Sequence, residues 1–133
     1  MKYLLDTNIC IALIKRKPAR MIERITATAV GEIGISTVTL GELRYGLAKS
    51  IQKDRNRLAL EEFLLPLEIM DFDEKAAETY GIVRAALEKA GMPIGPLDTQ
   101  IGAHALSLGS VLVTNNTREF RRIPGLDVED WTA

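Results

Sequence analysis

The stretch YLLDTN, residues 3–8, decides how the remainder of this sequence is interpreted. A short apolar run ends abruptly in the carboxylate of Asp6, which is followed by Thr7 and Asn8. The run predicts a short buried strand over residues 2–6. A carboxylate among leucines is unfavourable unless it is paired, hydrogen-bonded or bound to a metal ion. Asp6 could cap the next helix, but Thr7 and Asn8 can also do so, and its role stays open at this point.

Short apolar strands alternate with helices along the rest of the chain. Further strands are expected over 32–36, 67–72, 110–114 and 126–128. The expected helices cover 8–16, 18–28, 39–50 with Thr37 or Thr39 as cap, 53–65, 74–90 capped by Asp73, and 97–108 ended by Gly109, with a short turn after Asn115 and Asn116. This alternation is typical of an α/β fold in which a central parallel sheet of four to five short strands is covered on both faces.

Length and composition favour one cytoplasmic domain. The 133 residues are enough for a hydrophobic core, and 47% apolar with 26% charged residues is ordinary for a soluble globular protein. The single cysteine, Cys10, cannot form an internal disulfide, which fits a reducing compartment. The sequence has no run of the ~18–20 apolar residues that a membrane span needs, and its start does not resemble a signal peptide.

Charge is distributed unevenly although the net charge is only −1. Residues 1–57 have 11 Lys or Arg against 5 Asp or Glu, whereas residues 58–133 have 6 against 13. A basic half could contact phosphates and an acidic half could hold cations, but solvated helix faces would give the same asymmetry.

Acidic or amide side chains follow three of the expected strands or begin a helix. Besides Asp6, they are Glu42 beside the buried Leu43, Asp98 in the first turn of its helix, and Asn116 with Glu119 after the strand 110–114. Each alone has an ordinary explanation as a cap, a partner of the helix dipole or turn chemistry. Because ligands bind at the carboxyl ends of parallel strands, we expect these groups to lie together.

Several carboxylates without balancing Lys or Arg repel one another unless a cation lies among them. Oxygen ligands with few histidines suit Mg²⁺ or Mn²⁺ better than zinc. Such sites serve phosphoryl transfer, which predicts that Asp6 is a metal ligand.

Four segments resemble the PIN-domain ribonucleases, and more narrowly the VapC toxins of toxin–antitoxin pairs: YLLDTNI, TLGELRYG, PIGPLDTQIGAHA and VLVTNNTREF. The resemblance extends over essentially the whole chain, including IPGLDVEDW near its end. It implies a single three-layer α/β/α PIN-like domain over residues 1–133.

The resemblance also implies roles for the acids. Asp6 and Asp98 match the two metal-binding aspartates, and Glu42 matches the acid that completes the catalytic site. Asn116 stands where many relatives have Asp, and Glu119 where others do, so this sequence departs from the commonest pattern at its fourth acidic position. We expect Mg²⁺, with Mn²⁺ as a substitute, and catalytic roles for Glu119 and Asn116. Thr114 is expected to add a hydroxyl contact to substrate.

A VapC-like protein is expected to cleave structured RNA, and the resemblance points to a tRNA anticodon stem-loop. Basic residues are expected to contact the flanking phosphates: Arg44, Arg118, Arg121, Arg122, Arg20 and the run Lys15-Arg16-Lys17. The family implies a homodimer, a small VapB-like antitoxin with an arginine placed among the carboxylates, and possible higher assembly with that antitoxin.

Other functions have weaker support in the sequence. A haloacid-dehalogenase-type phosphatase needs an aspartate where Asn8 stands, and no G-x-G-x-x-G follows the first strand. His104, the only histidine, is interpreted as structural, as is Cys10. The remaining alternative is a PIN-like RNA- or protein-binding module that has lost catalysis, for which Asn116 is the best argument.

Overall fold

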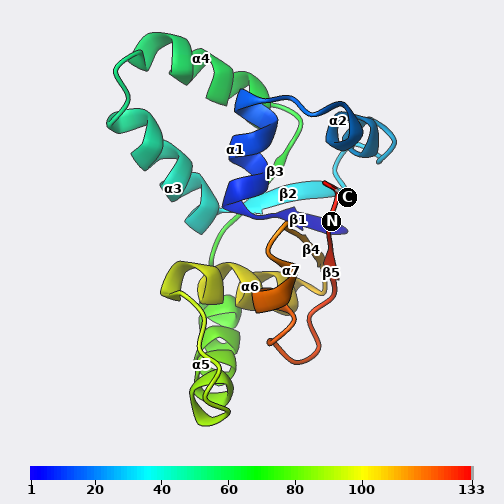
Figure 1. Ribbon diagram of the computed structural model, residues 1–133, viewed down its shortest axis with the longest axis vertical. Helices are drawn as coiled ribbons and strands as arrows, with labels where there is room; N and C mark the ends of the chain where they lie inside the picture. Colours follow the sequence, from blue (N-terminus) through cyan, green and yellow to red (C-terminus); the bar gives the residue numbers. More distant parts are fainter. Residues whose placement is uncertain (133) are drawn as a thin grey trace.

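A parallel sheet lies in the middle of the molecule, with helices on both of its faces (Figure 1). The computed structural model describes residues 1–132. Within that range five strands are arranged in the order β3-β2-β1-β4-β5, and every neighbouring pair is parallel. The strands are β1 (Tyr3–Leu5), β2 (Ile33–Ser36), β3 (Glu68–Met70), β4 (Val111–Val113) and β5 (Val128–Glu129). The expected three-layer α/β fold is confirmed.

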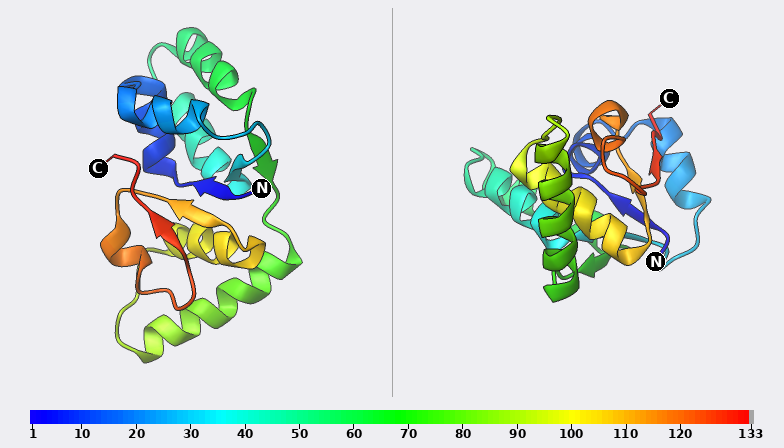
Figure 2. Two further views of the ribbon diagram at one scale, coloured as in Figure 1. Left: turned by 90° about the vertical axis from the view of Figure 1, so that its right-hand side faces the viewer. Right: turned by 90° about the horizontal axis from the view of Figure 1, so that it is seen from below.

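Helices α1 to α4 cover one face of the sheet and α5 to α7 cover the other, as the second view also shows (Figures 1 and 2). Their bounds are α1 (Thr7–Lys15), α2 (Ala19–Thr26), α3 (Thr37–Ala48), α4 (Lys53–Leu64), α5 (Glu74–Lys89), α6 (Pro96–Leu108) and α7 (Thr117–Phe120). In the described part of the chain, none of these helices is both long and apolar enough to cross a membrane.

Two hydrophobic cores lie on the two sides of the sheet, because successive side chains of a strand point to opposite faces. Leu5 and Val113 belong to the core beneath α1–α4, whereas Leu4 and Leu112 belong to the core beneath α5–α7. All four side chains are fully buried. These central strands therefore consist of continuous apolar residues, which is the pattern of a parallel sheet covered on both faces.

The ends of several elements differ from the expectation. Ser36, and not Thr37 or Thr39, caps α3, because Ser36 keeps an extended backbone and its hydroxyl accepts from the Val38 N–H at 3.0 Å. The last strand lies at Val128–Glu129 and shares only residue 128 with the expected range. Asp73 and Gly109 cap α5 and α6 as expected, with Gly109 in the left-handed region at φ 66°.

Candidate active site

Asp6 lies directly after β1 and caps α1. Its Oδ1 accepts from the Ile9 N–H at 2.9 Å, and its Oδ2 accepts from the Thr114 hydroxyl. Only 4% of Asp6 is exposed. Burial raises the pKa of Asp6 to about 6, opposed by these two hydrogen bonds and reinforced by the negative charges of Asp98 and Glu42. Asp6 therefore caps α1 and also belongs to the acidic site, although the sequence left these two roles as alternatives.

Glu42 reaches the same region from α3, which begins where β2 ends. Its Oε1 accepts from the Thr7 hydroxyl at 2.7 Å. That hydroxyl also lies 3.3 Å from the hydroxyl of Thr39, which is buried one turn before Glu42. Thr7 therefore fixes the carboxylate of Glu42 beside the start of α1.

Asp98 lies in the first turn of α6, after the helix has begun at Pro96. A helix N-terminus favours an ionised carboxylate. The pKa of Asp98 is nevertheless raised, first by burial and then by the charges of Glu42 and Glu119. Burial and the neighbouring like charges together thus outweigh the favourable helix terminus.

A chain of hydrogen bonds joins Glu119 to Asp6. The side-chain amide of Asn116 donates to Glu119 Oε2 at 3.0 Å, and the Asn116 backbone N–H donates to the Thr114 hydroxyl oxygen at 2.9 Å. The Thr114 hydroxyl in turn donates to Asp6. The segment after β4 therefore holds two acids in place.

The four acids have no cationic partner in the part of the chain that the structure describes. Its four ion pairs involve other carboxylates, those of Glu32, Glu129, Asp54 and Glu88. Over residues 1–132, however, no group of three or more His, Cys, Asp or Glu is close enough to form a ready metal cage. The four acids therefore bring negative charge together, but they do not form a closed set of metal ligands.

A groove of about 610 Å³ runs from these acids along α1, α3 and α4. Asp6, Glu42 and Asp98 line it together with Lys15 and Lys49. Apolar side chains complete its walls: Ile11, Ile14, Leu43, Leu47 and Leu60. The groove combines an acidic part, two lysines and an apolar surface.

Comparison with known proteins identifies the family. The model of the PIN domain matches residues 3–126. The tRNA(fMet)-specific endonuclease VapC of Shigella flexneri is 48% identical over 132 residues, which cover 99% of both chains. The chain belongs to the VapC branch of the PIN-domain family. It is thus a member of an endoribonuclease family.

Solved VapC structures share the fold of this PIN domain throughout. The DNA-bound VapBC complex of Salmonella typhimurium contains a chain that is 47% identical, with a TM-score of 0.95 and 98% of each chain covered. The VapBC2 complex of Rickettsia felis, bound to a promoter DNA fragment, gives a TM-score of 0.94 at 42% identity, covering 98% of this chain and 99% of that one.

The predicted acids Asp6, Glu42 and Asp98 line one groove of this PIN domain, and Glu119 acts electrostatically on Asp98. The expected contact of Thr114 with substrate stays a prediction. Thr114 is fully buried, and its hydroxyl is engaged by Asp6 and by the Asn116 N–H.

Of the expected basic residues, Lys15 lines the groove. Arg44 and Arg118 are exposed on α3 and α7 but do not line it. Arg122 instead donates to the Pro93 carbonyl at 3.1 Å. Arg16, Lys17, Arg20 and Arg121 are exposed and do not line the groove.

The sequence interpretation missed two residues that line the groove, Tyr45 on α3 and Lys49 at its C-cap. They follow Glu42 by three and seven residues, a spacing that places them on one face of a helix. Extending the helical face of Glu42 toward the end of α3 would have found both. Tyr45 is 66% exposed, and the Lys49 ammonium lies 4.8 Å from the centre of its ring.

Cys10 and His104, which the sequence did not place in the site, are both buried. Cys10 is fully buried in the core beneath α1–α4, and burial raises the pKa of its thiol. His104 is 1% exposed on α6, and its Nδ1 lies 2.8 Å from the Ser36 hydroxyl oxygen.

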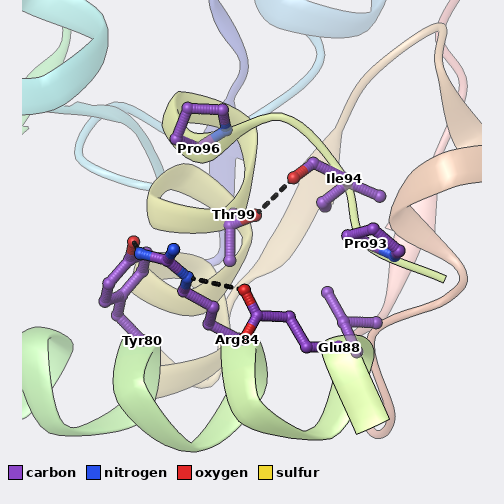
Figure 3. A pocket seen from close by; sticks show the side chains of 8 residues that line it. Tyr80, Arg84, Glu88, Pro93, Ile94, Pro96 and Thr99 are labelled. Atoms are coloured by element: carbon purple, nitrogen blue, oxygen red, sulfur yellow. Dashed lines mark hydrogen bonds and ion pairs between the residues drawn. The ribbon is translucent and has the colours of Figure 1, made fainter. Parts of the chain in front are cut away.

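A second cavity, of about 180 Å³, lies between α5 and the start of α6 (Figure 3). Arg84 donates there to Glu88 at 3.1 Å and to the Tyr80 hydroxyl at 3.0 Å, and Thr99 donates to backbone carbonyls. These polar side chains are already hydrogen-bonded within the protein, and none of the four acids lines this cavity. It is therefore not part of the candidate active site.

Proposed function

We propose that this chain is a Mg²⁺-dependent endoribonuclease toxin that hydrolyses a phosphodiester bond in a tRNA anticodon stem-loop in the cytoplasm. The observation that carries the proposal is a set of four mutually repelling carboxylates without a cation, in a chain closely related to tRNA-specific endonucleases. The cleavage is expected to leave a 5′-phosphate.

The donor set suits a hard divalent cation. Asp6 and Asp98 are the proposed ligands, with Glu42 and Glu119 acting directly or through water. Mg²⁺ usually keeps several waters and is held by one or two carboxylates, so it does not need a cage of three acids. Mn²⁺, which accepts the same oxygen ligands, is expected to replace it.

Bound Mg²⁺ would polarise the scissile phosphate and lower the pKa of an attacking water. The chain's own residues keep the donors oriented. Thr114 and the Ile9 N–H fix Asp6, Thr7 fixes Glu42, and Asn116 fixes Glu119. In this proposal Glu119 is the fourth acid and Asn116 orients it, because the amide donates to the carboxylate.

RNA would enter along the groove in single-stranded form. A loop exposes splayed phosphates and bases that a duplex keeps stacked. Lys15 and Lys49 are placed to contact phosphates, and Arg44 and Arg118 extend the basic surface outside the groove. The exposed ring of Tyr45 offers a surface on which a base can stack.

The same groove supports binding of a VapB-like antitoxin. Its apolar wall would accept hydrophobic side chains, and an arginine from the antitoxin would neutralise the acids in place of the metal ion. The related structures from Salmonella typhimurium and Rickettsia felis are VapBC complexes. We propose a homodimer of this chain within such an assembly.

Cleavage of total tRNA by the purified chain, freed of any bound partner, tests the proposal. Reactions would contain Mg²⁺, Mn²⁺ or EDTA, and the new 5′ ends would be mapped. Asp6→Asn should lose the activity while remaining folded, since Asn can still bond with Ile9 and Thr114. The matched control is Asp73→Asn, because Asp73 caps α5 through an equivalent 2.9 Å bond from the Ala76 N–H.

We expect discrete, metal-dependent cleavage by the wild type and by Asp73→Asn, and no such cleavage by Asp6→Asn. Equal products from all three proteins would identify a contaminating nuclease. Binding of tRNA without cleavage by the wild type would support the alternative of a PIN-like RNA-binding module that has lost catalysis, for which the amide at Asn116 is the structural argument.

A further inference from the structure

The buried imidazole of His104 connects the two helices that supply opposite sides of the acidic site. His104 lies on α6, six residues after Asp98, and Ser36 caps α3, six residues before Glu42. The Nδ1 atom and the Ser36 Oγ are 2.8 Å apart, and both residues are buried. This contact joins the start of α3 to α6.

The imidazole also contacts the connection between β3 and α5. Its ring packs edge-on against Phe72, with 5.3 Å between the ring centroids. The Phe72 N–H donates to the Thr37 hydroxyl at 3.1 Å, which fixes the first residue of α3 to the same connection. The start of α3 is thus held from two sides.

The contact with Ser36 suits one form of the imidazole. The Ser36 oxygen already accepts the Val38 N–H, so its hydroxyl hydrogen is free to donate to Nδ1. A neutral ring that accepts at Nδ1 carries its own hydrogen on Nε2.

Burial lowers the pKa of His104, opposed by the charge of Asp73, the backbone bond to Asp71 and the charge of Asp71. The neutral ring is therefore favoured at neutral pH. Of the described residues, these two aspartates are the charged groups that act on the imidazole.

We propose that His104 is a positioning residue for the active site, which sets the distance between the carboxylates of Glu42 and Asp98 by fixing α3 to α6. The inference rests on the proposed metal-binding function. Six residues of helix span about 9 Å, so a tilt of about 10° at this junction would displace either carboxylate by roughly 1.5 Å. Displacements of that size weaken binding and catalysis in a site that must hold a metal ion and a phosphate at fixed relative positions.

The test is the affinity of the folded protein for Mn²⁺, measured by electron paramagnetic resonance at a temperature well below unfolding. His104→Leu should weaken binding by about tenfold to a hundredfold, the usual effect of removing a group that orients a metal ligand. His104→Asn, whose amide oxygen can accept from Ser36, should recover most of the loss. The control Ser107→Ala removes a hydroxyl that bonds only to the His104 carbonyl and should leave the affinity unchanged.

A second measurement needs no variant. Because His104 is the only histidine, ¹⁵N-histidine labelling gives the resonances of this ring alone. We expect the neutral Nε2–H tautomer at pH 7, and a saturable shift of its resonances as Mg²⁺ is added. Resonances that do not shift while Mg²⁺ binds would overturn the inference even if the variants failed to fold.

The outcomes separate this inference from the proposed function. Equal Mn²⁺ affinity in the wild type and in folded His104→Leu would refute the positioning role while leaving the metal site intact. Failure of the wild type to bind Mn²⁺ would refute the metal site, and the positioning role with it.

Discussion

At the scale of single residues, Asp6 combines favourable hydrogen bonds with an unfavourable location. Both carboxylate oxygens accept a hydrogen bond, one from the Ile9 N–H and one from Thr114. Burial still dominates and raises the pKa of Asp6 to about 6 from an ordinary 3.8. Without a cation, ionised Asp6 therefore destabilises the folded state at neutral pH.

This destabilisation should be visible in the free energy of unfolding measured in EDTA. Because the folded pKa is raised, the wild type loses stability as the pH rises from about 4 through about 6. Asp6→Asn lacks that carboxylate and should be more stable than the wild type at pH 7 by up to ~3 kcal/mol, with the difference disappearing below pH 4. Urea denaturation of both proteins between pH 3.5 and 8 measures it.

The control in that series is Asp73→Asn, which changes another capping aspartate. It should keep the wild-type dependence on pH around the pKa of Asp6, because Asp6 is unchanged in it. A constant offset between Asp6→Asn and the wild type at every pH would show that Asp6 titrates normally.

The sequence predicted which residues gather at the site better than how they contact one another. The carboxyl ends of parallel strands brought Asp6 and the Thr114–Glu119 segment together as expected. The sequence did not indicate that the Thr114 hydroxyl bonds to a buried carboxylate 108 residues away. Hydrogen-bond partners of this kind depend on tertiary placement, which local patterns do not specify.

At the scale of elements, α6 packs closely against the segment after β4, and this contact explains a glycine in the middle of a helix. A Cβ at Gly102 would lie 2.5 Å from the Ile123 Cδ1 and 3.3 Å from the Phe120 Cδ1. Both of those side chains are almost completely buried. The close approach of α6 therefore requires the absence of a side chain at this position.

Gly102→Ala should lower the free energy of unfolding by about 1–3 kcal/mol, because the added methyl overpacks the core. The matched control is Gly81→Ala on α5, where a Cβ would meet nothing within 4 Å. That change should stabilise the protein by about 0.5–1 kcal/mol through reduced backbone freedom. Urea denaturation compares the two, and changes of the same sign would contradict the packing argument.

Periodicity predicted the type and order of the elements well, and their ends less well. Alternation of apolar strands and helices is a local signal, and it identified the parallel sheet. The cap of α3 was misplaced by one to three residues because Ser36, Thr37 and Thr39 are all competent caps. The choice is made by the backbone, which stays extended at Ser36, where β2 ends.

At the scale of the whole molecule, residues from both ends of the chain complete the core beneath α1–α4. Trp131 is 1% exposed and packs edge-on against Tyr3, with 5.0 Å between ring centroids. Its indole N–H donates to Glu129 at 3.0 Å, and Glu129 is paired with Arg24 at 3.0 Å. Trp131 therefore joins β1, α2 and β5.

Trp131→Ala should destabilise the fold by about 3–5 kcal/mol, the usual range for a buried aromatic side chain. Trp131→Phe keeps the ring contact with Tyr3 and should lose much less, about 1 kcal/mol, for the missing bond to Glu129. Circular dichroism during urea unfolding gives both values. A loss below 1 kcal/mol in Trp131→Ala would mean that the chain end contributes little to the core.

The position of β1 has a consequence for synthesis. This strand is made first but lies in the centre of the sheet, and its partner β4 is made about a hundred residues later. At about 5–20 residues per second, a ribosome needs roughly 5–20 s to pass from Asp6 to Thr114. Until then Asp6 and the segment after β4 cannot come together, so the acidic site is completed only after most of the chain has been made.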